Sequence, residues 1–131
     1  MNSKKEIRAW HKVKVSERFL NAFRGMRVFL KTARHLPILI SAIVIVIILG
    51  FYLKVSGLEW IALIFSIGFV LVSETFNTAI EIDIDLTSPE YHPFARDTKD
   101  VAAAAVLLSI FTAAVIGLVV FLPKIFQYVN I

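Results

Sequence analysis

The chain has 131 residues, of which 58% are hydrophobic, and it contains no cysteine. Its apolar residues occur in long blocks, which indicates one small membrane protein domain. The absence of cysteine excludes disulfides, thiolate zinc sites and a cysteine nucleophile. The net charge of +4 does not indicate nucleic-acid binding, because the basic residues flank a membrane helix and form no recognisable nucleic-acid-binding motif. Anionic lipid headgroups are the simpler partner.

The N-terminal quarter of the chain is basic. We expect residues 1–15 to form a flexible basic tail. Residues 16–34 are predicted to form an amphipathic surface helix capped by Ser16, because apolar and basic residues each recur on their own face. The apolar face consists of Phe19, Phe23, Met26 and Leu30, and the basic face of Arg24, Arg27, Lys31 and Arg34. The basic face suits contact with lipid headgroups, and contact with nucleotide phosphates is the alternative.

Three later segments are predicted to be transmembrane helices. Residues 36–54 and 99–122 contain uncharged runs of eighteen and twenty-two residues, each long enough to span about 30 Å of hydrocarbon. Residues 59–85 contain a shorter uncharged run of fourteen, so this span is expected to continue to a polar end near one interface. Residues 86–98, which include two prolines, are predicted to form a loop. Asp97 is then placed to cap the third span.

The distribution of basic residues predicts the orientation in the membrane. Ten of the fourteen Lys and Arg residues precede residue 36, so the positive-inside rule predicts a cytoplasmic N-terminus. Three spans then place the 86–98 loop and the polar end of the second span on the cytoplasmic side. We therefore expect a multi-pass protein of the inner (cytoplasmic) membrane.

The second span carries a stripe of polar residues formed by Glu74, Asn77, Glu81 and Asp85. Offsets of three, seven and eleven place these side chains within about 80° on one helical face. Ionisable groups at membrane depth are costly and indicate a functional site, although the solvated end of a helix is the alternative for part of the stripe. Three carboxylates and an amide suit a site that holds a divalent cation and moves a proton.

Depth suggests different roles for these residues. Glu74 lies deepest and is suited to accept or carry a proton, whereas Glu81, nearer the water, is suited to bind a cation. Asn77 can hydrogen bond a phosphate or a hydroxyl without adding charge. The chain has no glycine-rich phosphate loop, so phosphate handling would depend on a lysine and a carboxylate-bound magnesium. Lys99 is the natural lysine, and an ordinary interface lysine is its alternative.

Residues 73–109 carry a run of specific motifs, SETFNTAIEIDIDLTSPEYHPFARDTKDVAAAAVLLS. Its elements ExxNTAIExxxD, EYHPFAR and KDxAAAAV resemble the signature region of the small prokaryotic integral-membrane lipid kinases, the diacylglycerol kinase and undecaprenol kinase family. The likeness in layout covers nearly the whole chain. It implies an all-α membrane protein with an N-terminal surface helix and three transmembrane helices, assembled as a homotrimer with active sites shared between subunits. It also implies transfer of the γ-phosphate of MgATP to a lipid hydroxyl.

The same resemblance implies roles for individual residues. Glu74 resembles the general base that takes the proton from the lipid hydroxyl, and Glu81 resembles the ligand of Mg2+. Contacts with the ATP nucleotide are implied for Asn77, Lys99, Asp100 and, nearby, Asp85. Tyr91 and His92 are weaker matches, as neighbours of the nucleotide base.

One departure from the family pattern concerns the metal. Ala33 stands where the family usually carries a glutamate that helps to hold it, and losing a carboxylate should weaken magnesium binding. His35 or Glu17 replaces that glutamate, or the ATP phosphates and Glu81 suffice, or activity is reduced or lost.

The acceptor and the class of function leave alternatives. Undecaprenol is modestly favoured over diacylglycerol, because the HPxA run, the KDxAAAAV run and the C-terminal GLVVFLPK resemble the undecaprenol-type members more. A non-catalytic homologue that binds nucleotide or lipid is the alternative that Ala33 suggests. A proton or cation pathway built on Glu74 and Glu81 is a third possibility.

Overall fold

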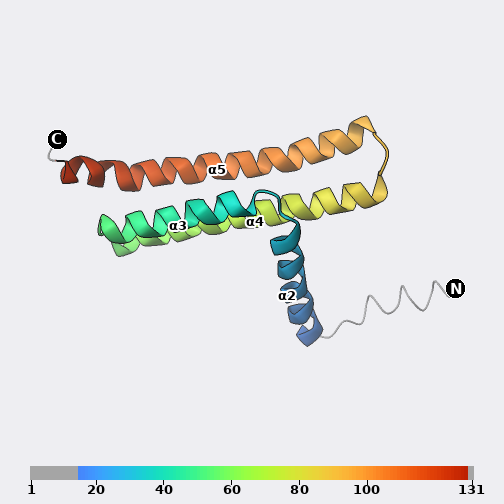
Figure 1. The fold of residues 1–131 in the computed structure, drawn as a ribbon, viewed down its shortest axis with the longest axis horizontal. Coiled ribbons are helices and arrows are strands. Elements are labelled where there is room, and N and C mark those ends of the chain that lie inside the picture. The colour runs from blue at the N-terminus through green and yellow to red at the C-terminus, as the bar shows by residue number, and fades with distance from the viewer. Residues whose placement is uncertain (1–14, 130–131) are drawn as a thin grey trace. The chain divides into compact units, whose positions relative to one another are not determined.

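A computed structural model describes residues 15–129, and these residues form four α-helices and no strand (Figure 1). The helices are α2 (Val15–Thr32), α3 (Leu36–Tyr52), α4 (Gly57–Thr87) and α5 (Pro93–Tyr128). α2 belongs to one compact unit of the chain, and α3, α4 and α5 belong to a second. The predicted all-α class is confirmed. The basic tail predicted for residues 1–15 lies, except for Val15, outside the described residues.

α2 is the predicted amphipathic helix. Its first described residue, Val15, is already helical, so Ser16 lies inside the helix and is not the predicted N-cap. A residue inside the helix is in the wrong place to cap its N-terminus. Lys31 lies in the last turn, where a cation interacts favourably with the helix dipole.

The turn between α3 and α4 is fixed by two local motifs. At the end of α3, the Val55 N–H donates to the Gly50 carbonyl (3.0 Å) and the Lys54 N–H donates to the Phe51 carbonyl (3.3 Å). This is the Schellman pattern, and Lys54 occupies its left-handed position with φ of 51°. The last carbonyls of α3 are thereby satisfied, and Val55 is buried at 8% exposure.

α4 then begins with a capping box. The Ser56 N–H donates to Glu59 Oε2 (2.7 Å), and the Glu59 N–H donates to Ser56 Oγ (3.4 Å). Glu59 Oε2 also pairs with Lys124 Nζ of α5 at 3.0 Å. Nearby, the hydroxyls of Tyr52 and Tyr128 lie 2.6 Å apart and hydrogen bond. The end of α5 is therefore tied to the α3–α4 turn by side-chain contacts.

The lengths of the helices agree with a membrane protein. α4 has 31 residues and α5 has 36, and both are long and apolar enough to cross a bilayer. α3 has 17 residues, which extend about 25 Å at 1.5 Å per residue and reach the lower end of the range for a span. Its N-terminal turn contains Pro37, because the first turn of a helix tolerates proline.

The connection between α4 and α5 is shorter than expected. α4 continues to Thr87 and α5 begins at Pro93, so only residues 88–92 of the predicted 86–98 loop are outside helices. His92 is the N-cap of α5, and its Nδ1 accepts from the Phe94 N–H at 3.3 Å. The prediction that Asp97 caps this helix is therefore wrong, because Pro93 supplies an earlier start that suits a first helical turn.

The end of α5 also differs from the prediction. The third span was expected to stop at residue 122, but α5 continues through Pro123 to Tyr128. In this last part of α5, Lys124 pairs with Glu59 and Tyr128 hydrogen bonds Tyr52. The additional helical residues therefore contact the α3–α4 turn.

α4 forms its main contact with α5, which runs antiparallel to it, and α3 packs against α4 (Figure 1). The core near the α3–α4 turn is formed by Val55, Leu63, Val120 and Phe121. Ser66 and Ser109 are buried further along, and each hydroxyl donates to a carbonyl of its own helix, at 2.9 and 2.7 Å respectively. These bonds satisfy polar groups that would be costly in an apolar interior.

We expect Gly50→Ala to lower the thermal midpoint of unfolding in detergent. A Cβ at Gly50 would lie 2.5 Å from Trp60 Cη2, and overpacking of this kind destabilises by about 1–3 kcal/mol. Gly68→Ala is the matched control, since a Cβ there meets no atom within 4 Å and alanine favours helix. Equal midpoints for the two variants would contradict the close contact between Gly50 and Trp60.

Candidate functional site

Part of the polar stripe of α4, together with Thr78, is buried inside the second unit. Glu74, Asn77 and Thr78 are only 4%, 7% and 6% exposed, although all three are polar. Glu81 is half-buried and Asp85 is exposed, so the stripe runs from the interior to the surface. The offsets of three and four residues explain why these side chains share one face. Asp83 lies off this face and is exposed.

Asn77 is held by one neighbour and leaves one acceptor unsatisfied. Its Nδ2 donates to Glu81 Oε1 at 3.0 Å. Its Oδ1 is buried and has no hydrogen-bond partner among the described residues. Buried polar atoms are nearly always paired in folded proteins, so an unpaired one indicates a site that is completed by another group.

A polar cavity of about 280 Å3 lies beside the stripe. Its acidic lining consists of Glu74, Glu81 and Asp85, and its basic or neutral lining consists of Arg34, His35, Thr78 and Lys99. Lys99 Nζ forms an ion pair with Asp85 Oδ1. The cavity therefore brings together both charge signs from the start of α3, from α4 and from α5.

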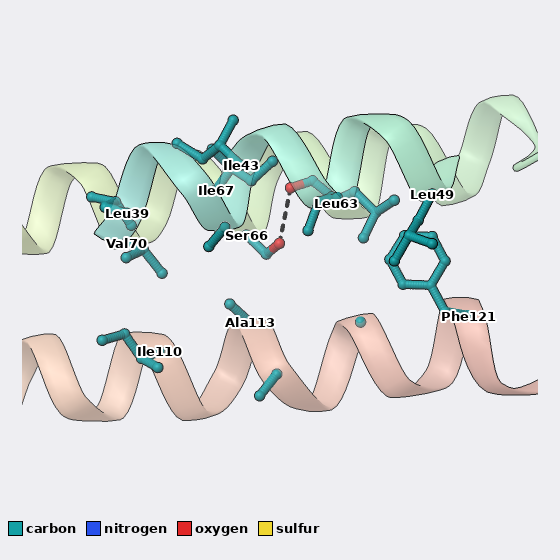
Figure 2. Close-up of a pocket in the computed structure, with 14 residues that line it drawn as sticks. Leu39, Ile43, Leu49, Leu63, Ser66, Ile67, Val70, Ile110, Ala113 and Phe121 are labelled. Carbon is teal, nitrogen blue, oxygen red and sulfur yellow. Dashed lines mark hydrogen bonds between the residues drawn. The ribbon is translucent and has the colours of Figure 1, made fainter. Parts of the chain in front are cut away.

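An apolar space continues from the polar one. A second cavity, of about 460 Å3, is lined by Glu74, Asn77 and Glu81 at its polar end and mostly by aliphatic side chains elsewhere. A third, of about 320 Å3, extends it between α3, α4 and α5 and is lined almost entirely by apolar residues. Figure 2 shows this third cavity, with Leu39 and Val70 toward one end and Leu49 and Phe121 toward the other.

Glu74 lies where the polar and apolar spaces meet. It lines both the 280 Å3 and the 460 Å3 cavities, as do His35 and Glu81. Leu39 and Val70 line both the 460 Å3 and the 320 Å3 cavities. Within residues 15–129 the Glu74 carboxylate has no hydrogen bond or ion pair. A buried carboxylate without a partner is able to accept a proton from a group placed beside it.

Other predicted site residues lie elsewhere. Asp100 is exposed, does not line the polar cavity and lies 3.7 Å from Arg96 as an ion pair. Tyr91 is 77% exposed, and His92 caps α5. The nucleotide contacts inferred for these three residues remain predictions.

The oxygen-rich lining fits a hard divalent cation in part. Glu81 uses one oxygen for Asn77, which leaves Oε2 for a ligand bond, and carboxylate oxygens suit Mg2+. Among the described residues, no three His, Asp or Glu side chains gather closely enough to hold a metal ion on their own. Mg2+ is commonly bound by one or two carboxylates together with substrate phosphates, and this donor set matches that mode.

Two cavity residues were not assigned to the site beside the stripe in the sequence analysis: Thr78 had no role, and Arg34 had nucleotide contact only as the alternative for the basic face. Thr78 follows Glu74 by four residues, so helical periodicity alone would have identified it. Arg34 was placed on the basic face of the surface helix, but it lies after the end of α2 and lines the polar cavity. No pattern within one helix indicates that contact.

Comparisons with known proteins agree with this arrangement. The family model described as prokaryotic diacylglycerol kinase matches residues 20–121. The chain is 37% identical to an undecaprenol kinase of Bacillus subtilis over 107 residues, which cover 82% of this chain and 87% of that protein. It is 32% identical to a diacylglycerol kinase of Escherichia coli K12 over 56% of this chain and 61% of that protein. A diacylglycerol kinase of Helicobacter pylori (strain 26695) is 41% identical over 49% of this chain and 50% of its own length. No solved structure matches the chain.

We expect Glu74→Gln to raise the thermal midpoint of unfolding. The substitution keeps the shape of a buried side chain and removes a carboxylate that lacks a partner among the described residues, which lowers the desolvation cost. The exposed Asp83→Asn is the matched control and should leave the midpoint unchanged. A lower midpoint for Glu74→Gln would mean that the carboxylate makes a stabilising contact in the assembled protein.

Proposed function

We propose that this chain, which belongs to the prokaryotic diacylglycerol kinase family and is therefore a lipid kinase, transfers the γ-phosphate of MgATP to the hydroxyl of a membrane lipid. The observation that carries the proposal is the position of Glu74 at the junction of a polar cavity and an apolar one. A lipid kinase must bring a charged nucleotide and an apolar chain to one point. This junction is suited to both.

Glu74 is proposed as the general base. The lipid hydroxyl, lying beside the buried carboxylate, would give its proton to Glu74 as its oxygen bonds to the γ-phosphorus. The bond between that phosphorus and the β,γ-bridging oxygen breaks, and ADP leaves with the electron pair. General base catalysis of this kind contributes about 10²–10⁴-fold, and positioning and charge stabilisation supply the rest.

Other residues would hold the nucleotide. Glu81 would bind Mg2+, which offsets the charge of the phosphates when bound. Asn77 keeps Glu81 in place through its 3.0 Å hydrogen bond, and Lys99 would contact the phosphates from α5. Asp85 positions Lys99 through their ion pair. Asp100 would approach the nucleotide from the same turn of α5 only if it leaves Arg96.

The apolar cavities would take the lipid chain. They extend along α4 from Glu81 to Leu63, a separation of about 27 Å at 1.5 Å per residue. We favour undecaprenol as acceptor, because the relative named undecaprenol kinase matches 82% of this chain, against 56% for the diacylglycerol kinase of Escherichia coli. Diacylglycerol is the alternative acceptor.

The site would lie at the cytoplasmic face of the inner membrane. The positive-inside rule supports a cytoplasmic N-terminus, and nucleotides are found on that side. We further propose a homotrimer. Only 22% of the apolar stretch of α4 and 17% of that of α5 are buried in a single copy, which leaves surface for further copies as well as for lipid.

The kinase proposal is tested by transfer of labelled γ-phosphate from MgATP in mixed micelles, with undecaprenol and diacylglycerol offered in parallel. We expect a labelled lipid from the unchanged protein, a rate about 10²–10⁴-fold lower for Glu74→Gln, and none from Glu81→Ala. Binding of MgATP without transfer to either lipid would favour the non-catalytic alternative that Ala33 suggests. Ion flux in liposomes without transfer would favour a proton or cation pathway.

The lipid-chain cavity is tested by filling it. Ala113→Phe adds a ring in the 320 Å3 cavity, so we expect a higher KM for the lipid acceptor and an unchanged KM for MgATP (Figure 2). Ala104→Phe is the control, since Ala104 is exposed on the same helix and lines none of the three cavities. Both variants should first show thermal midpoints close to that of the unchanged protein. Equal acceptor KM values for them would argue against a chain in this cavity.

A further inference from the structure

Arg34 occupies the short connection between α2 and α3. It follows the last residue of α2 by two positions and precedes the first residue of α3 by two. Its side chain lines the polar cavity, together with that of His35. From α4, Glu74 and Glu81 line the same cavity. A cationic side chain and two carboxylates therefore border one space.

The charges in this space are unevenly paired. Lys99 is bonded to Asp85, but neither the Arg34 side chain nor the His35 side chain has a hydrogen bond or ion pair within residues 15–129. Arg34 also lies beyond ion-pair distance of Glu74 and Glu81, although all three border one cavity. The guanidinium thus has its donors available, and Glu74 and the second oxygen of Glu81 have their acceptors available for another ligand.

A cavity that is lined by both a guanidinium and carboxylates suits a metal-bound polyphosphate. Its phosphate oxygens accept hydrogen bonds from a guanidinium, which presents a rigid fork that matches them in pairs. Its cation is taken by carboxylate oxygens. The volume of about 280 Å3 is far above the roughly 10–15 Å3 that one water needs.

We propose that Arg34 binds the polyphosphate chain of the donor nucleotide through its guanidinium, in the cavity that the carboxylates of α4 also line. The inference rests on the proposed kinase function and adds a phosphate-binding residue to it. Arg34 supplies the second positive charge of the cavity, since the charge of Lys99 is shared with Asp85. His35, the adjacent lining residue, offers a further nitrogen to the same phosphates.

The test is calorimetric binding of MgATP, MgADP and AMP to the full chain in lipid bicelles. Arg34→Gln should weaken MgATP and MgADP by about tenfold to a hundredfold, the range for a hydrogen bond to a charged group. AMP should change less than twofold, because it lacks the polyphosphate. Arg34→Lys should recover part of the loss, since it restores the charge without the fork. Arg18→Gln, an exposed arginine of α2, is the control for the loss of one positive charge.

Unchanged MgATP binding by Arg34→Gln would overturn the inference, and so would equal weakening of all three nucleotides. Contact of Arg34 with lipid headgroups instead would also give unchanged nucleotide binding.

The kinase proposal and the Arg34 proposal can be overturned independently of each other. If Arg34→Gln leaves phosphate transfer unchanged, the kinase proposal is retained and the role of Arg34 is rejected. If nucleotide binding depends on Arg34 but no phosphate is transferred to either lipid, the phosphate contact is retained and the kinase proposal is rejected.

Discussion

The constraint on which this structure depends is the burial of polar side chains in helices that are otherwise apolar. Glu74, Asn77 and Thr78 are nearly inaccessible, and hydrocarbon supplies no hydrogen bonds to them. Serines deeper in the bundle meet this constraint by bonding carbonyls of their own helices. The residues of the stripe meet it only in part, through the bond between Asn77 and Glu81. The Glu74 carboxylate and the Asn77 side-chain oxygen have no hydrogen-bond partner among the described residues. We interpret this loss of stability as a cost of the proposed chemistry at the site.

The site is assembled from residues that are distant along the chain. α4 supplies the carboxylates, α5 brings Lys99 to Asp85 across the 88–92 connection, and the residues before α3 complete the polar cavity. The apolar cavities open from the same point, because the small and aliphatic residues of α3 and α5 leave space beside α4. Under the proposed function, the Glu74 carboxylate would meet the charged nucleotide and the apolar lipid at this one point.

Much of this arrangement could be predicted from the sequence. Helical periodicity placed Glu74, Asn77 and Glu81 on one face, and uncharged length identified the apolar helices. Periodicity describes one helix at a time, so it could not show that Arg34 borders the same cavity or that Asp100 pairs with Arg96. The predicted helix ends were wrong where more than one residue could cap or end the helix. His92 and Pro93 offered an earlier start than Asp97, and Pro123 did not end α5.

The ties between helices are distributed unequally. At the α3–α4 turn, the Schellman motif, the capping box and the Tyr52–Tyr128 bond hold all three helices of the second unit together. At the other end, the ion pair of Lys99 and Asp85 joins α5 to α4, and no side-chain bond within residues 15–129 joins α3 to either. Among the described residues, side-chain bonds therefore hold α3 to its neighbours only near the turn. Its N-terminal half borders the cavity that reaches Glu74. In the proposed membrane location, a lipid would approach this cavity from within the plane of the bilayer, without passing through water.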